Sequence, residues 1–144
     1  MDLQKSAMGV ARLMCAAQLD GATDTVLLDL AVAASDRLHA DPKARSDDGA
    51  LTIDAALLTK ACSDAGLEAK CATLLELAQG EAAKKALRAN TEEAVARGAY
   101  GSPTAFVVVG EASEAMFFGS DRMEQLAHHL SLPYAGARPP HAKL

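Results

Sequence analysis

Residues 118–122 (Phe-Gly-Ser-Asp-Arg) combine polar groups that could bind a small charged ligand. Asp121 could take an ammonium group, and the open main-chain amides beside Ser120 could hold a carboxylate. An α-amino acid carries both charges on one carbon and would satisfy both groups. The structural alternative is that an acidic residue in a first helical turn complements the helix dipole, by about 0.3–1 kcal/mol. Taken alone, the two residues favour this structural interpretation.

A second segment, residues 98–103 (Gly-Ala-Tyr-Gly-Ser-Pro), lies directly before an apolar run. Pro103 could simply mark the entry to a strand, or the Ser102–Pro103 bond could be cis. A cis X-Pro bond costs only about 0.5–1 kcal/mol, yet about 5–6% of X-Pro bonds in folded proteins are cis. These residues alone leave both interpretations open.

The three cysteines, Cys15, Cys62 and Cys71, form no C-x-x-C pair. Their spacing supports neither a dithiol redox centre nor a zinc knuckle. Each lies in an Ala- and Leu-rich stretch, where a buried, unreactive thiol is the usual state. The odd count, without a secretory signal, indicates a reducing compartment. His128 and His129 are adjacent rather than at ligand spacing, so we expect a surface pair and no metal site.

The chain before residue 98 is predicted to be helical. Apolar residues recur with the 3.6-residue helical period, and Ala and Leu favour helices. The polar residues 41–49 form the clearest loop. The expected helices span residues 3–19, 23–38, 52–65, 67–79 and 81–97.

Capping residues define where these helices begin and end. Thr23 or Asp24 is expected to cap the second helix, and Thr52 the third, because their side chains can accept from first-turn amides. Gly66 and Gly98 are expected to adopt left-handed conformations just past two helix ends.

After Gly98 the pattern changes to that of a β-hairpin and a helix. The apolar, partly β-branched run at 104–109 predicts a buried strand. Ser120 or Asp121 is expected to cap the last helix. The predicted strand, turn, strand, helix and tail span residues 104–109, 110–114, 115–118, 120–130 and 132–144.

Composition favours a mostly α protein. The order of the predicted elements divides the chain into a helical domain at residues 1–92, a hairpin and helix at 93–131 and a tail at 132–144. The chain has 144 residues, of which 50% are apolar, with no Trp and few other aromatics. A net charge of −5 argues against nucleic-acid binding, which requires clustered basic residues. No apolar run approaches the ~18 residues of a membrane span, and residues 2–5 do not lead into a signal-peptide core.

Residues 91–104 (Thr-Glu-Glu-Ala-Val-Ala-Arg-Gly-Ala-Tyr-Gly-Ser-Pro-Thr) and 116–124 (Met-Phe-Phe-Gly-Ser-Asp-Arg-Met-Glu) together resemble the closing half of kappa-class glutathione transferases. The wider DsbA-like group, including 2-hydroxychromene-2-carboxylate isomerases, shows a weaker form, more often with Gln before Asp-Arg. The helices up to Leu67 look like the helical domain that the family inserts into its thioredoxin fold. The resemblance implies a mostly α (α+β) fold: a helical domain followed by the C-terminal ββα half of a thioredoxin-like fold.

The resemblance also implies a glutathione site, with glutathione as substrate and no metal. Ser102, before a cis Pro103, would pair its main-chain N–H and C=O with the cysteinyl residue of glutathione. Ser120 and the adjacent amide would hold the γ-glutamyl carboxylate, and Asp121 the ammonium. Arg122 is assigned no chemistry.

The chain departs from the family pattern at its start. The family's thiolate-stabilising serine follows the first strand of an N-terminal βαβ half, and this half is expected to be missing here. No catalytic residue is therefore assigned, and activity of these residues alone is doubtful. The strand at 104–109 would present an unpaired edge, which suggests a truncated product, a homodimer or a subunit of a larger assembly.

Three functions follow from these observations. The first is a kappa-class transferase homologue that conjugates the glutathione thiol to small electrophiles. The second is a non-catalytic interaction or structural subunit, and the third is a glutathione-dependent isomerase of the hydroxychromene type. The closing residues Ala142-Lys143-Leu144 are a variant of the S-K-L peroxisomal address. They predict a peroxisomal location, with a mitochondrial one as the alternative.

Overall fold

The computed structural model describes residues 8–40, 53–111 and 113–136. It separates into two compact units, Met1–Thr91 and Glu92–Leu144. The helices are α1 (Met8–Leu19), α2 (Asp24–Ala40), α3 (Ala55–Asp64), the 3₁₀ turn η3 (Glu68–Lys70), α4 (Cys71–Gln79), α5 (Glu81–Ala96), the 3₁₀ turn η4 (Ser120–Arg122) and α6 (Met123–His129). The strands are β1 (Thr104–Val107) and β2 (Ala115–Phe118).

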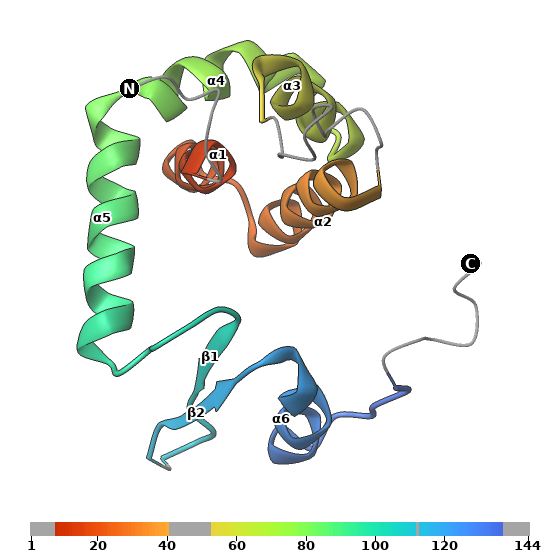
Figure 1. Cartoon of the computed structure of the whole chain (residues 1–144), viewed down its shortest axis with the longest axis vertical. Helices are drawn as coiled ribbons and strands as arrows, with labels where there is room; N and C mark the ends of the chain where they lie inside the picture. Colours follow the sequence, from red (N-terminus) through yellow and green to blue (C-terminus); the bar gives the residue numbers. More distant parts are fainter. Residues whose placement is uncertain (1–7, 41–52, 112, 137–144) are drawn as a thin grey trace, which may run out of the picture. The chain divides into compact units, whose positions relative to one another are not determined.

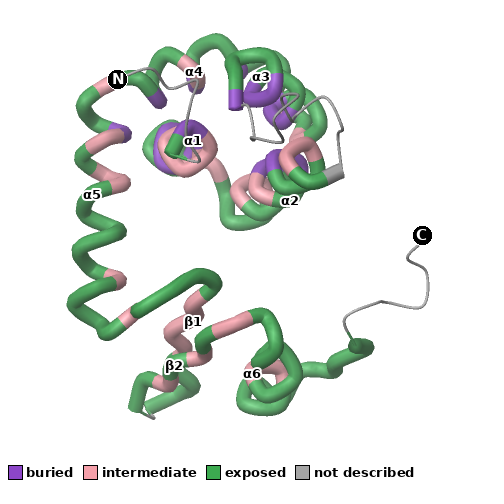
Figure 2. The backbone as a smooth tube through the Cα atoms, viewed as in Figure 1, coloured by how far each residue is buried: buried purple, intermediate pink, exposed green. Residues whose placement is uncertain are grey.

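The first unit is built around α1, which packs against α2 and α4, while α2 packs against α3 (Figure 1). Small and aliphatic side chains let these helices approach closely, and Leu13, Leu30 and Leu74 are among the largest fully buried side chains. Figure 2 shows the buried residues gathered where these helices face one another. The structure is mostly helical, as the composition predicted.

Several predicted helix boundaries are confirmed. Helix α2 begins at Asp24, and the Thr23 hydroxyl oxygen accepts a hydrogen bond from the main-chain N–H of Val26 at 3.4 Å. Gly66 and Gly98 have φ angles of 72° and 91°, the left-handed conformation expected of glycines that end helices.

Two boundaries in the helical unit differ from the predictions. Asp54, not Thr52, caps α3: its carboxylate accepts from the N–H of Leu57 at 2.8 Å. Thr52 lies outside the described residues. Ile53 is 4% exposed and packs in the core before the helix starts. The first polar residue after it, Asp54, is therefore the one that caps the helix. The single helix predicted over 67–79 is divided into η3 and α4, with Leu67 preceding the 3₁₀ turn.

The second unit contains the predicted β-hairpin. β1 and β2 pair antiparallel, with Thr104 opposite Phe118 and Val107 opposite Ala115. The first strand is shorter than predicted, because its partner offers only four residues and Val108 and Val109 continue beyond it with 57% and 42% exposure. The prediction of a buried strand is wrong, since every residue of β1 is only half-buried.

The start of the last helix also differs from its prediction. Ser120 and Asp121 form the 3₁₀ turn η4 with Arg122, and α6 begins only at Met123. Neither η4 nor α6 has a side-chain cap, so the predicted cap by Ser120 or Asp121 is wrong.

Within the described ranges, no helix is long and apolar enough to cross a membrane. The predicted 41–49 loop and the closing residues 142–144 lie outside those ranges.

Candidate functional site

The hairpin register brings together the two segments that the sequence singled out. Because Thr104 lies opposite Phe118, the residue before one strand meets the residue after the other. The main-chain N–H of Gly119 donates to the carbonyl oxygen of Pro103 at 3.0 Å. The Ser102–Pro103 peptide bond is cis, one of the two alternatives left open by the sequence.

An aromatic side chain supports the loop before Pro103. The rings of Tyr100 and Phe118 lie with their centroids 4.5 Å apart at an interplanar angle of 48°. Gly101 leaves room for this ring, because a Cβ there would lie 2.9 Å from Cζ of Phe118. The Thr104 hydroxyl donates to the Gly101 carbonyl oxygen at 2.7 Å. Loop and strand end are therefore held together by both packing and hydrogen bonds.

The acidic residue of the site sits on the short turn η4. Gly119 precedes it with a φ of 97°, in the region that favours glycine. The Asp121 carboxylate lies over Gly119, where a Cβ would approach Oδ1 closely. Its other oxygen is 3.6 Å from Nε of Arg122, and the Asp121 side chain is 76% exposed. The carboxylate is thus placed beside the Pro103–Gly119 junction and is open to a ligand.

Main-chain groups complete the site. Within the described residues, the N–H and C=O of Ser102 and the N–H groups of Ser120 and Asp121 form no main-chain hydrogen bond outside regular helices and strands. All three residues are exposed. This part of the molecule therefore offers donors, an acceptor and a carboxylate at one end of a hairpin, a set suited to binding a zwitterionic ligand.

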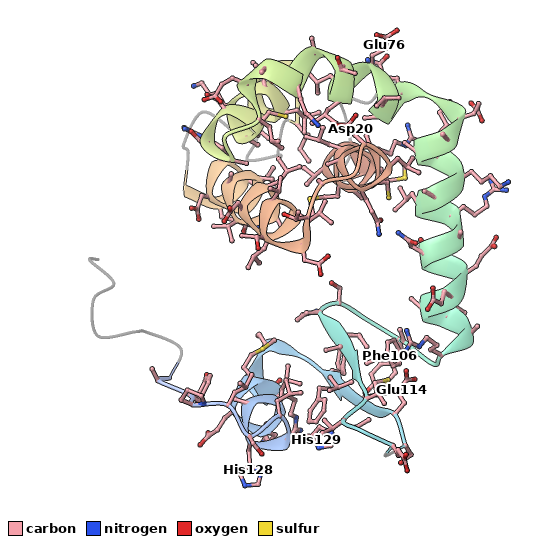
Figure 3. All side chains as sticks on the ribbon, turned by 180° about the vertical axis from the view of Figure 1, so that it is seen from behind. Asp20, Glu76, Phe106, Glu114, His128 and His129 are labelled. Carbon is pink, nitrogen blue, oxygen red and sulfur yellow. The ribbon has the colours of Figure 1, made fainter. Side chains whose placement is uncertain are left out.

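Arg97, which the sequence analysis did not assign, fixes the other end of the loop. Its guanidinium lies 4.5 Å above the ring of Phe106 and pairs with Glu93 at 3.1 Å and with Glu114. Figure 3 shows Phe106 and Glu114 close together near the end of α5. Hydrogen bonding to Glu114 raises the pKa of the Arg97 guanidinium. Only the pair with Glu93 could be read from the sequence, because the two residues are four positions apart on one predicted helix.

The histidine pair takes no part in this arrangement. His128 and His129 project from α6 in different directions (Figure 3), and the His129 ring lies 5.4 Å from that of Phe117. Over the described ranges, no group of three or more His, Cys, Asp or Glu residues is arranged to hold a metal ion.

The family model for DsbA-like thioredoxin domains matches residues 3–131. The chain belongs to this family. The mostly helical architecture with a small sheet is compatible with a DsbA-like thioredoxin fold. Membership indicates a thiol-related or glutathione-related function for this DsbA-like domain. No curated protein matches the chain with significance.

The helical unit of this DsbA-like chain has a separate hollow of about 190 Å³. Its lining is mainly apolar and comes from α1, the start of α2, η3 and α4: Ala17, Asp20, Gly21, Ala22, Thr23, Val26, Leu67, Lys70 and Leu74. Lys70 Nζ lies 2.7 Å from Asp20 Oδ2, so each charge at this hollow already has a partner. None of the predicted site residues lines it.

Proposed function

We propose that this DsbA-like domain binds glutathione, and that it is a kappa-class glutathione transferase homologue whose site includes Ser102, Pro103, Ser120 and Asp121. The observation that carries the proposal is the hydrogen bond from the Gly119 N–H to the Pro103 carbonyl oxygen. It joins the segment expected to meet the cysteinyl residue of glutathione to the segment expected to meet its γ-glutamyl group.

The chemistry of each group supports this assignment. The Ser102 N–H and C=O suit the main chain of the cysteinyl residue, which would add to the loop as an extended segment. The amides of η4 and the Ser120 hydroxyl suit the γ-glutamyl carboxylate, and the Asp121 carboxylate suits its ammonium. Conjugation to an electrophile would then use the bound thiol as nucleophile. The proposal assigns binding residues only and no thiol-activating residue.

Calorimetric titration of glutathione into the whole chain tests the proposal. Asp121→Asn should weaken binding about tenfold, equivalent to about 1.4 kcal/mol. Glu124→Gln is the matched control, because Glu124 is an exposed acid in the first turn of α6 and its replacement changes the net charge equally. This control should bind as the unmodified protein does.

A change in the ligand tests the pairing itself. Glutaryl-cysteinyl-glycine lacks only the ammonium group of glutathione, so it should lose about as much affinity as Asp121→Asn loses. Combining the variant with this analogue should then cost little more than either change alone, because both remove the same contact. Additive losses would place the ammonium elsewhere.

The second candidate is an interaction subunit, favoured by the exposed apolar residues of the hairpin unit. β1 pairs only with β2 within the described residues, and Met116 and Val108 are 41% and 57% exposed. A sheet edge of this kind can pair with another chain. Absence of glutathione binding by the folded protein would favour this function over the transferase, and would equally exclude the glutathione-dependent isomerase.

A further inference from the structure

The hollow in the helical unit lies where the end of α1, the start of α2 and the turn η3 meet α4. Ala17 and Leu74 are its most deeply buried lining residues, and each is 1% exposed. Gly21 and Ala22 also line it, and their lack of side-chain volume leaves the space open. The hollow measures about 190 Å³. This is large enough for a ligand, because a cavity of about 150 Å³ with an aliphatic and aromatic lining binds benzene.

Main-chain hydrogen bonds fix the walls of this hollow without help from a ligand. The N–H of Ala22 donates to the Ala17 carbonyl oxygen at 2.9 Å, which closes the end of α1. The N–H of Lys70 donates to the Leu67 carbonyl oxygen at 3.0 Å, which shapes η3. The hollow is therefore formed in advance, as most small-molecule sites are, and a ligand would not have to order its surroundings.

The polar side chains of the lining are already paired. Lys70 Nζ lies 2.7 Å from Asp20 Oδ2 (Asp20 is labelled in Figure 3), and the Thr23 hydroxyl oxygen accepts from the N–H of Val26 at 3.4 Å. A charged ligand would give up its hydration here without meeting an unpaired charge. Water in the hollow meets few available donors and acceptors for the same reason, so an apolar ligand can displace it at little cost. The lining therefore favours apolar molecules.

We propose that the helical unit binds an uncharged, apolar small molecule, of about the size of one aromatic ring, in this hollow. The Asp20–Lys70 ion pair lies on its solvent-facing side, since these side chains are 30% and 58% exposed whereas Ala17 and Leu74 are buried. A ligand would therefore rest on the apolar floor with the ion pair beside its entrance. The site belongs to a different unit from the proposed glutathione site, shares no residue with it and does not depend on it.

Methyl NMR spectra of the whole chain, recorded during a titration with benzene, test the proposal. Saturable shifts are expected for the methyl groups that line the hollow, those of Val26, Leu67 and Leu74. The methyl groups of Val107 should not move, because this residue belongs to β1 in the other unit. Benzoate carries a carboxylate on the same ring and should bind at least about tenfold more weakly, because the hollow offers no unpaired cation. Equal affinity for benzoate, shifts confined to the hairpin unit or absence of saturation would each overturn the proposal.

A variant that fills the hollow tests its position. Ala22→Leu adds side-chain volume at the wall and should raise the Kd for benzene at least about tenfold. Ala99→Leu is the matched control, because Ala99 also follows a left-handed glycine that ends a helix, Gly98, but lies in the other unit. Its N–H donates to the Ala94 carbonyl oxygen at 2.9 Å, the counterpart of the bond made by Ala22. The control should bind benzene as the unmodified protein does, and unchanged affinity in folded Ala22→Leu would overturn the proposal.

The opposite change decides the matter if Ala22→Leu does not fold. Val26→Ala removes two methyl groups from the lining and enlarges the hollow, so it should shift the preference from benzene towards the larger p-xylene. The expected shift is about fourfold in relative Kd for each methyl group of p-xylene that becomes buried. Val32→Ala is the matched control, because Val32 lies on the same helix, is 51% exposed and does not line the hollow. An unchanged preference in Val26→Ala, or an equal change in Val32→Ala, would contradict the proposed site.

Discussion

Gly101 lies directly against the ring of Phe118 in the candidate site. A methyl group there would overlap the Phe118 ring, which already packs against Tyr100. We expect Gly101→Ala to displace the ring and to destabilise the hairpin unit by about 1–3 kcal/mol. Hydrogen exchange of β1 and β2, followed by mass spectrometry, measures this loss.

A second substitution provides the control for Gly101→Ala. In a Phe118→Leu background the colliding ring atoms are absent, so adding Gly101→Ala should cost much less than it does in the unmodified protein. An equal cost in both backgrounds would mean that the loop itself, rather than the ring, requires glycine.

The ionisation of Cys62 should make the stability of the helical core depend on pH. Burial, followed by the hydrogen bond with Cys71, raises the pKa of the Cys62 thiol from 9.0 to about 12. A raised folded-state pKa contributes stability that is complete below the unfolded value and declines as pH rises through the interval from 9.0 to about 12. The free energy of unfolding should therefore fall by at most about 1.4 kcal/mol per pH unit there because of this thiol.

Urea unfolding at several pH values from about 8 to about 11 checks this slope. Cys62→Ala is expected to be less stable at neutral pH, because it leaves a cavity, but to show a shallower decline above pH 9 than the unmodified protein. Identical slopes in the two proteins would contradict the assignment of the decline to Cys62.

Individual residues also show how far a sequence can predict a site. The proposed main-chain role of Ser102 and carboxylate role of Asp121 rest on residue types and a family resemblance. The structure brings the two segments that carry these residues together at the Pro103–Gly119 hydrogen bond. The role of Arg97 could not be predicted from residue type and spacing. Its contacts with Phe106 and Glu114 depend on how the hairpin folds beside the end of α5.

At the scale of elements, α3 depends on its cap. The Asp54 carboxylate satisfies the N–H of Leu57, one of the first-turn donors that have no partner inside a helix. Asp54→Ala should destabilise the helical unit by about 1 kcal/mol. Asp54→Asn retains an accepting oxygen and should cost much less. A lower urea midpoint for Asp54→Ala alone is the expected result, and equal midpoints would show that the cap contributes nothing.

The β-hairpin depends on Arg97 in a comparable way. This side chain holds the ring of Phe106 and the carboxylate of Glu114 against the end of α5. Arg97→Gln should raise hydrogen exchange in β1 and in the segment around Glu114, and Arg97→Lys should recover part of the protection, because lysine keeps the charge but not the planar contact. Arg88→Gln, on the exposed side of the same helix, should leave the hairpin unchanged.

Elements were predicted best where a local rule determined them. Thr23, Gly66 and Gly98 act where capping rules placed them. The end of β1 was not a local property, since the ladder stops where the partner strand stops. The start of α3 was also predicted at the wrong residue. Ile53 is buried in the core, and the N-cap is the next residue, Asp54.

The whole molecule combines two units that differ in their amount of buried surface. All fully buried side chains among the described residues lie in Met1–Thr91, and the described part of Glu92–Leu144 contains none (Figure 2). Since burial of apolar surface is the main stabilising contribution, the hairpin unit should open at a lower free energy than the helical unit. Native-state hydrogen exchange should show slow amides in α1 and α4 and faster ones in β1, β2 and α6.

Glutathione should change this difference in a specific way. A ligand that binds the folded form alone stabilises it by about 2.7 kcal/mol at a hundredfold excess over its Kd. If the ligand site is formed by the Pro103–Gly119 junction and Asp121, the added protection should appear in β1, β2 and η4, and exchange in the core of α1 should change little. Asp121→Asn should reduce this effect. Protection that appears instead around the hollow beside Lys70 would place glutathione on the helical unit and contradict the proposed site.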